Sequence, residues 1–448
     1  MENNLDTDKI KELVWRLAFP SMLAQFVSVF YSIVDRMYIG NIKEIGDLAL
    51  AGVGVCGPIV TMISSVAFWV GIGGAPLLSI RLGQKNEKNA EEILANCFLL
   101  LTAMSVGITI LSLAIKDSLL NWFGAGGAVF PYADDYITIC LMGTVFALLS
   151  TGMNQFIICQ GFAKVGMKSV LIGAILNIIL DPVFIFGFHM GVSGAALATV
   201  ISQMASCIYV LRFLFSRRPM IRITFGGYQI KVMGRVLLLG LTPFLIIAFD
   251  NILIISLNAT IQKYGGAARG DMLLTCNTIL QSFMLIVTMP LSGITGGTQT
   301  ILGYNYGARR PDRIKKAQKH IFILGLVFTT IMFGIAQSLP RYFTMIFTRD
   351  PQYIDMTVRA IRIYSLMIIP LTVQYTVVDG FTGMGIAGVA ISLSTFRKLI
   401  YFAGVFLIPL WFDITNIFYT EPISDLVAAV ASGIVYLLLI KKIEEGIL

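Results

Sequence analysis

Long apolar segments alternate with short polar ones along the whole chain. Crossing about 30 Å of hydrocarbon takes roughly twenty helical residues, and twelve apolar runs are long enough. These runs cover residues 15–39, 48–80, 93–115, 133–160, 166–188, 193–215, 234–261, 271–302, 320–339, 356–382, 386–410 and 423–440. The pattern predicts an all-α integral membrane protein with twelve transmembrane helices.

Composition excludes the soluble classes of protein. Of the 448 residues, 56% are apolar and only 13% are charged, whereas about a quarter of an ordinary soluble chain is charged. Residues 1–16 are polar and amphipathic and do not resemble a cleavable signal. We therefore expect a multi-pass membrane protein that keeps its N-terminal segment.

The distribution of Lys and Arg predicts an orientation. Most of the 33 Lys and Arg residues fall in connections on the side of the N-terminus, and such residues favour the cytoplasmic face. We expect both termini in the cytoplasm and the chain in a bacterial inner (cell) membrane. The net charge of +8 then indicates orientation and affinity for anionic lipids rather than for nucleic acid. The basic run 309–319 is interpreted as orientation charge too.

The chain repeats itself at about half its length. Pro20 matches Pro243 and Asp35 matches Asn258, and each pair is separated by 223 positions. Six spans in each half make both halves enter the membrane from the same side, so a pseudo-two-fold axis along the membrane normal relates two six-helix bundles. We expect an N-terminal bundle at 1–215, a basic cytoplasmic linker at 216–235 and a C-terminal bundle at 236–448.

Four carboxylates lie inside apolar runs: Asp35, Asp181, Asp250 and Asp379. An acid at the centre of a lipid-facing helix costs about 2.5–3.5 kcal/mol. These side chains must therefore face protein or water. The alternative hypothesis for Asp181 is a hydrogen bond that only fixes helix packing, and for Asp35 it is a side chain that reaches the membrane interface.

The stretch "ILNIILDPVFIFGF" (175–188) concentrates this chemistry. Asn177 precedes Asp181 by four residues, which places both on one helix face. Pro182 lacks an N–H, leaves the carbonyl of Ile178 unpaired and is expected to break the helix. Tyr31 shares a face with Asp35 in the same way. Such oxygen groups suit Na⁺ or a carboxylate that gains and loses a proton.

Other cofactor chemistry has little support in the sequence. The six cysteines lie inside spans without paired spacing, and there are only two histidines. We expect no disulfide, no transition-metal site and no cofactor apart from the coupling ion.

Several segments resemble one transporter family. "FPSMLAQFVSVFYSIVDRMYIG", "GGAPLLSIRLGQKN" and "LNIILDPVFIFG" are similar to the first, second and fifth spans of the multidrug and toxic compound extrusion (MATE) family. "GYNYGARRPDRIKKA" is similar to the start of its ninth span. The resemblance implies antiport of drugs and other cations, driven by Na⁺ or H⁺.

The resemblance also implies roles for particular residues. It places ion coupling, including Na⁺ binding, in the N-terminal bundle at Asp35, Asn177, Asp181 and Thr199. Supporting residues would be Tyr31, Tyr136 and Asn154, with hinges at Pro20 and Pro182. The C-terminal bundle departs from the family pattern, and its candidates for a second site are Asp250, Asn258 and Asp379.

Three functions compete at this stage. The favoured one is a multidrug efflux antiporter for amphipathic cationic compounds, because buried acids attract cations. The alternative is a flippase for lipid-linked precursors from the same wider superfamily, which would more often have cationic residues facing its cavity. An intramembrane aspartyl protease is not expected, because no "GxGD" segment is present, so we expect no enzyme. The two halves already supply the symmetry of a transporter, and we expect a monomer.

Overall fold

The computed structural model describes residues 4–42, 46–123 and 129–444, so the outermost ends of the two predicted bundles lie outside the described residues. The first half of the chain forms α1 (Ile10–Gly40), α2 (Gly46–Gly83), α3 (Glu87–Ala114), α4 (Lys116–Trp122), α5 (Phe130–Met142), α6 (Thr144–Ile158), α7 (Ala163–Pro182) and α8 (Gly191–Phe215). The second half forms α9 (Ile230–Gly307), α10 (Pro311–Ser338), α11 (Pro340–Thr344), α12 (Pro351–Tyr364), α13 (Ile368–Gly383), α14 (Ala387–Trp411) and α15 (Thr420–Glu444).

Twelve spans are present when bent helix pairs are counted as one span each. In the described part of the chain, ten helices are long and apolar enough to cross a membrane. Two further spans consist of the pairs α5–α6 and α12–α13, which bend by 54° and 50°. α9 holds two of the ten, because the chain reverses at Gly266, where φ is +69° and glycine meets no steric penalty. The predicted all-α fold with twelve spans is confirmed.

Pro182 changes the type of helix rather than breaking it. α7 runs to Pro182 and continues at once as a π-helical turn, Val183–Gly187. A proline removes one backbone donor, and a wider turn is one way to accommodate that loss. The expected break behind Asp181 is therefore wrong, and the carboxylate lies within continuous helix.

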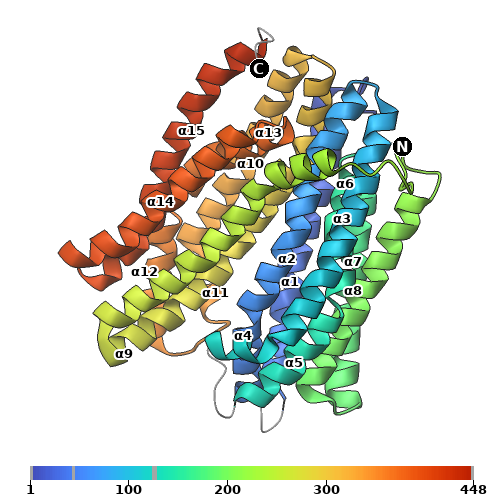
Figure 1. Ribbon diagram of the computed structural model, residues 1–448. Helices are drawn as coiled ribbons and strands as arrows, with labels where there is room; N and C mark the ends of the chain where they lie inside the picture. The colour runs from blue at the N-terminus through green and yellow to red at the C-terminus, as the bar shows by residue number, and fades with distance from the viewer. Residues whose placement is uncertain (1–3, 43–45, 124–128, 445–448) are drawn as a thin grey trace.

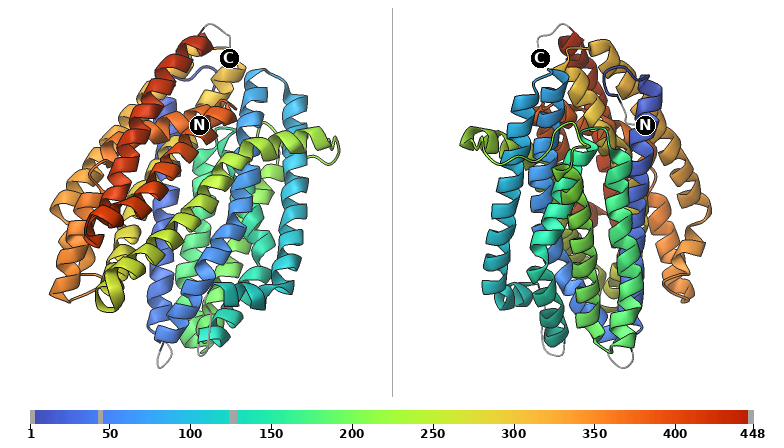
Figure 2. Two further views of the ribbon diagram at one scale, coloured as in Figure 1. Left: turned by 60° about the vertical axis from the view of Figure 1, so that its left-hand side comes forward. Right: turned by 90° about the vertical axis from the view of Figure 1, so that its right-hand side faces the viewer.

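The two halves of the chain lie side by side, and both termini are at the same end of the molecule (Figure 1). α1–α8 form one group of helices and α9–α15 the other, as the turned views also show (Figure 2). One buried apolar cluster joins the halves through residues such as Leu17, Leu78, Ile301 and Val377. Two further clusters each belong to a single half.

Glycines allow the closest contacts between the halves. A Cβ on Gly83 of α2 would lie 1.9 Å from the carbonyl oxygen of Tyr304, and a Cβ on Gly307 of α9 would lie 2.1 Å from that of Ile80. Gly83 and Gly307 are 224 positions apart, as are Ile80 and Tyr304. The same contact is thus made twice, as a two-fold axis requires.

Two arginines of the basic run tie the N-terminal segment to the second half. Arg313 donates to the carbonyl oxygens of Leu5 and Asp8, each at 3.1 Å. Arg310 forms an ion pair of 2.5 Å with Asp6. These arginines therefore hold structure together, in addition to the orientation role that the sequence suggested.

Candidate cation-binding site

Three helices of the first half bring the predicted coupling residues together. α1 packs against α7, and α7 packs against α8. Asn177 of α7 donates through Nδ2 to Asp181 Oδ1 at 3.2 Å and to Thr199 Oγ1 of α8 at 3.3 Å. The carboxyl group of Asp35 on α1 lies within hydrogen-bonding reach of that of Asp181. All four residues thus form one group.

The group is buried and holds acceptor oxygens without partners. Asp181 is 0%, Asn177 2% and Asp35 9% exposed. One oxygen of each residue, namely Asp35 Oδ1, Asn177 Oδ1 and Asp181 Oδ2, accepts no hydrogen bond. Burying a polar atom without a partner is costly. An oxygen-binding cation or an added proton would remove that cost.

The charges lead to the same conclusion. Two facing carboxylates cannot both remain ionised away from water unless a cation lies beside them or they share a proton. Within the described residues, no group of three or more His, Cys, Asp and Glu side chains could hold a metal ion. A carboxylate pair with an amide and a hydroxyl instead suits a hard monovalent cation or a proton.

The predicted supporting residues divide into two sets. Tyr31 of α1 lies close enough to interact electrostatically with Asp35 and Asp181. Tyr136 of α5 is close to Asp35. Asn154 is elsewhere: its side chain donates to the carbonyl of Gly166 and accepts from Ser169, near the start of α7. The structure thus places the two tyrosines at the site and Asn154 apart from it.

Pro20 lies within a single continuous helix. It lies in the third turn of α1 and, lacking an N–H, cannot form the hydrogen bond to the carbonyl of Arg16. The neighbouring Ser21 packs against Gly293 and Gly297 of α9. A hinge role for Pro20, or for Pro182, stays a prediction.

The three candidates in the second half share no hydrogen bond or ion pair with one another among the described residues. Asp250 pairs with Lys398. Asp379 accepts from Thr295 at 2.5 Å and from Gln299 at 3.2 Å. Asn258 accepts from Asn277 at 3.1 Å. Each candidate has different partners among the described residues.

Two little-exposed acids of α15, Glu421 and Asp425, are not among the residues that the sequence pattern predicts. Both bind the guanidinium of Arg397 on α14, at 2.6 Å and 2.7 Å. A signal was present, since Arg397 and Lys398 lie inside an apolar run and require counter-charges. The four-residue spacing of Glu421 and Asp425 puts both on one helix face.

Comparison with known proteins places the chain in a family. The MatE family model matches residues 20–183 and 247–407, one stretch in each half. The multidrug export protein MepA of Staphylococcus aureus (strain MSSA476) is 22% identical over 429 residues, which are 94% of this chain and 92% of MepA. MepA of Staphylococcus haemolyticus is 23% identical over 443 residues, 96% of this chain and 94% of that protein.

Solved structures share the fold. An outward-facing multidrug resistance MATE family transporter of the MOP superfamily is 21% identical, with a TM-score of 0.91 and 98% of both chains covered. A MOP superfamily transporter from Pyrococcus furiosus, described by the reverse polarity of its binding pocket, is 22% identical, with a TM-score of 0.92 and the same coverage. With the family model matched over more than half of the chain, this multi-pass membrane protein belongs to the MatE family, the multidrug and toxic compound extrusion family that its motifs resemble.

Proposed function

We propose that the chain is a multidrug efflux antiporter that exports amphipathic cationic compounds against an inward flow of Na⁺ or H⁺. The relatives named multidrug export protein support this function. The observation that carries it is the buried group of Asp35, Asn177 and Asp181 with its unpartnered oxygens.

Coupling follows from charge. When neither cation nor proton is bound, the two carboxylates give the first half a buried negative charge that favours a cationic compound. Binding of Na⁺ or a proton neutralises that charge, so the ion and the exported cation compete. Each ligand then stabilises a different state of the same protein.

The location and assembly belong to the same proposal. Both termini, which lie at one end of the molecule (Figure 1), would face the cytoplasm of a bacterial cell and the spans would cross its inner membrane. The protein works as a monomer, contacts membrane lipids and catalyses no covalent chemistry. The flippase alternative has less support, because Arg397 is bound by two carboxylates and the neighbouring Lys398 is paired with Asp250, so no excess of positive charge is available for phosphate.

Efflux from vesicles tests the proposal. Purified protein in vesicles is given a cationic dye, with a Na⁺ gradient and a pH gradient imposed in separate experiments. We expect one gradient to drive transport, and we expect Asp181→Asn and Asp35→Asn to reduce it to background, because an amide cannot ionise.

The exposed Asp355, which is 71% accessible, provides the control, and Asp355→Asn should transport like the wild type. Normal efflux by both buried variants would exclude this coupling site.

A further inference from the structure

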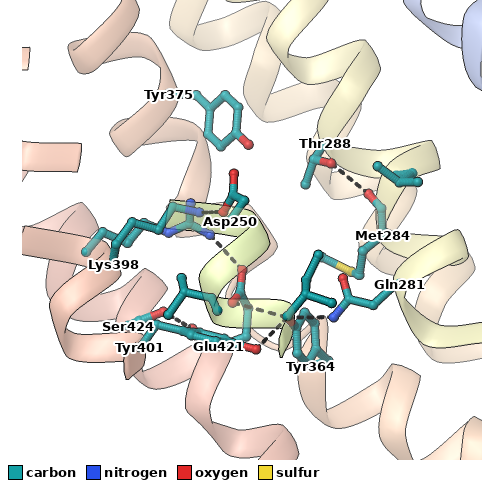
Figure 3. Close-up of a pocket in the computed structure, with 14 residues that line it drawn as sticks. Asp250, Gln281, Met284, Thr288, Tyr364, Tyr375, Lys398, Tyr401, Glu421 and Ser424 are labelled. Carbon is teal, nitrogen blue, oxygen red and sulfur yellow. Dashed lines mark hydrogen bonds and ion pairs between the residues drawn. The ribbon is translucent and has the colours of Figure 1, made fainter. Parts of the chain in front are cut away.

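The second half contains a cavity lined by charged and apolar side chains (Figure 3). Its volume is about 220 Å³, and its walls come from α9, α12, α13, α14 and α15. Leu253, Met284 and Leu285 of α9 form an apolar part of the lining, beside the charged Asp250 and Lys398. The cavity is built from other helices than the cation-binding group of the first half.

One set of charges in this wall is bound together by an arginine, with one oxygen, Asp425 Oδ2, left without a partner. Arg397 donates from Nε to Asp425 at 2.8 Å and from Nη2 to Glu421 at 2.6 Å. The other oxygen of Glu421 accepts from the hydroxyl of Tyr364 at 3.3 Å. The side chains of Arg397, Glu421 and Asp425 are 11%, 12% and 0% exposed. These three side chains are thus bound mainly to one another and are little exposed.

The pair of Lys398 and Asp250 is different. The two side chains form an ion pair, and Asp250 is 44% and Lys398 15% exposed. Figure 3 shows the pair at the cavity wall, with the hydroxyl of Tyr375 directed towards Asp250. A ligand entering the cavity therefore meets a carboxylate and an ammonium that neutralise each other.

We propose that this cavity binds amphipathic zwitterions, with the cationic group of the ligand on Asp250, its anionic group on Lys398 and its apolar part against the α9 wall. Lys398 serves as an internal counter-ion for Asp250 while the cavity is empty. This inference rests on the proposed function only in treating the bound compound as an exported substrate.

A zwitterion can replace the ion pair of Lys398 and Asp250 without leaving either charge uncompensated. A ligand with only a cation would displace Lys398 and leave its ammonium without a counter-charge in a site mostly removed from water, which is costly. A ligand with only an anion would leave Asp250 in the same position. A ligand with both charges replaces one ion pair by two. Because Lys398 and Asp250 are in contact, the two charges of the ligand must also be close together.

Binding of three matched probes to the full-length protein tests this. Naphthylalanine carries adjacent ammonium and carboxylate groups on an apolar ring system, its methyl ester carries only the cation, and its N-acetyl derivative only the anion. We expect the zwitterion to bind at least about ten-fold more tightly than either single-charge probe in equilibrium dialysis. Equal binding of the three probes, or no binding of naphthylalanine, would overturn the proposal.

Two variants should reverse the preference in opposite directions. Lys398→Met frees Asp250 and should favour the methyl ester, whereas Asp250→Asn frees Lys398 and should favour the N-acetyl probe. Lys398→Arg should keep the preference for the zwitterion, and Arg341→Met, at an exposed position, should change nothing. The thermal midpoint of each variant shows whether it is folded, and uniform loss of the three probes in folded variants would contradict the proposal.

The result is separable from the proposed function. Asp181→Asn should abolish ion-driven dye efflux and leave the order of probe binding intact. If the wild type showed no ion-driven efflux, the proposed function would fail. The relative affinities of the three probes would still show whether the cavity prefers zwitterions.

Discussion

At the scale of single residues, the two halves differ in how their buried charges are compensated. Arg397 lies between Glu421 and Asp425, so that its charge is compensated by hydrogen-bonded carboxylates. Asp35 and Asp181 face each other and retain oxygens without partners. Carboxylates that hold a buried cation of the protein suit a structural role, whereas a pair of carboxylates without such a cation suits a site that exchanges ions.

Arg397 should therefore matter for stability. Arg397→Met removes the only cation that the structure pairs with Glu421 and Asp425 among the described residues. Removing one member of a buried ion pair typically costs about 3–5 kcal/mol. We expect the midpoint of thermal unfolding in detergent to fall by several degrees.

The matched control for this prediction is Arg341→Met. Arg341 pairs with Asp355 at 3.4 Å, and their side chains are 61% and 71% exposed. Exposed pairs contribute little to stability, so this variant should unfold with the wild type. Equal midpoints for the two variants would mean that the buried triad does not stabilise the fold.

The sequence predicts residues of the candidate site only where neighbouring positions along the chain reveal them. Asn177 and Asp181 are four residues apart, and an acid within an apolar run is conspicuous, so both were found. Asp425 lies close to the start of its predicted run, and Glu421 lies before it, so neither stood out as intramembrane. Asn154 was misplaced because its position along α6, relative to α7, depends on packing that no local pattern encodes.

At the scale of elements, the main departure from prediction is a bend in the fourth span of each half. The predicted runs 133–160 and 356–382 each contain two helices, joined at Gly143 and at 365–367. Hydropathy continues across both joints, so the apolar pattern could not reveal them. Pro370 lies in the first turn of α13, where proline is tolerated, and was the one available signal for the second joint.

The first joint is fixed by a close contact. Gly143 has a φ of −83°, which any residue adopts, but a Cβ there would lie 2.4 Å from Val200 Cγ2 on α8. Val200 is β-branched and cannot easily turn away. We expect Gly143→Ala to destabilise the protein by about 1–3 kcal/mol, measured as a lower thermal midpoint.

Gly107→Ala on α3 is the control for this effect. A Cβ at Gly107 meets no atom within 4 Å. Alanine also has the higher helix propensity, so this variant should be at least as stable as the wild type. A similar loss in both variants would assign the effect to helix flexibility rather than to contact with Val200.

At the scale of the whole molecule, the halves are held together towards one end. Gly83 and Gly307, which make two of the close contacts between them, are the last residues of α2 and α9. Arg313 ties the N-terminal segment to the second half near the same end. The buried clusters that belong to a single half contain residues at the far ends of their spans, such as Ile39 and Ile261. Contacts between the halves are thus concentrated at the end that carries the termini.

Because of this arrangement, we expect the contact between Gly307 and α2 to influence how the two halves are oriented. A Cβ on Gly307 would lie 2.1 Å from a backbone oxygen of α2, and backbone cannot rotate away as a side chain can. Gly307→Ala should therefore push the halves apart at the end that carries the termini. If the halves move as rigid bodies, their far ends should approach each other.

Spin labels measure both ends at once. One pair replaces the exposed Trp122 and Tyr342, at the far ends of the first and second halves. The other replaces Lys88 and Lys316, near the termini, which are also exposed. We expect Gly307→Ala to shorten the first distance and lengthen the second. Gly334→Ala, where a Cβ would meet nothing within 4 Å, should leave both unchanged. Unchanged distances in a stably folded Gly307→Ala protein would mean that the contact relaxes locally and does not govern how the halves are arranged.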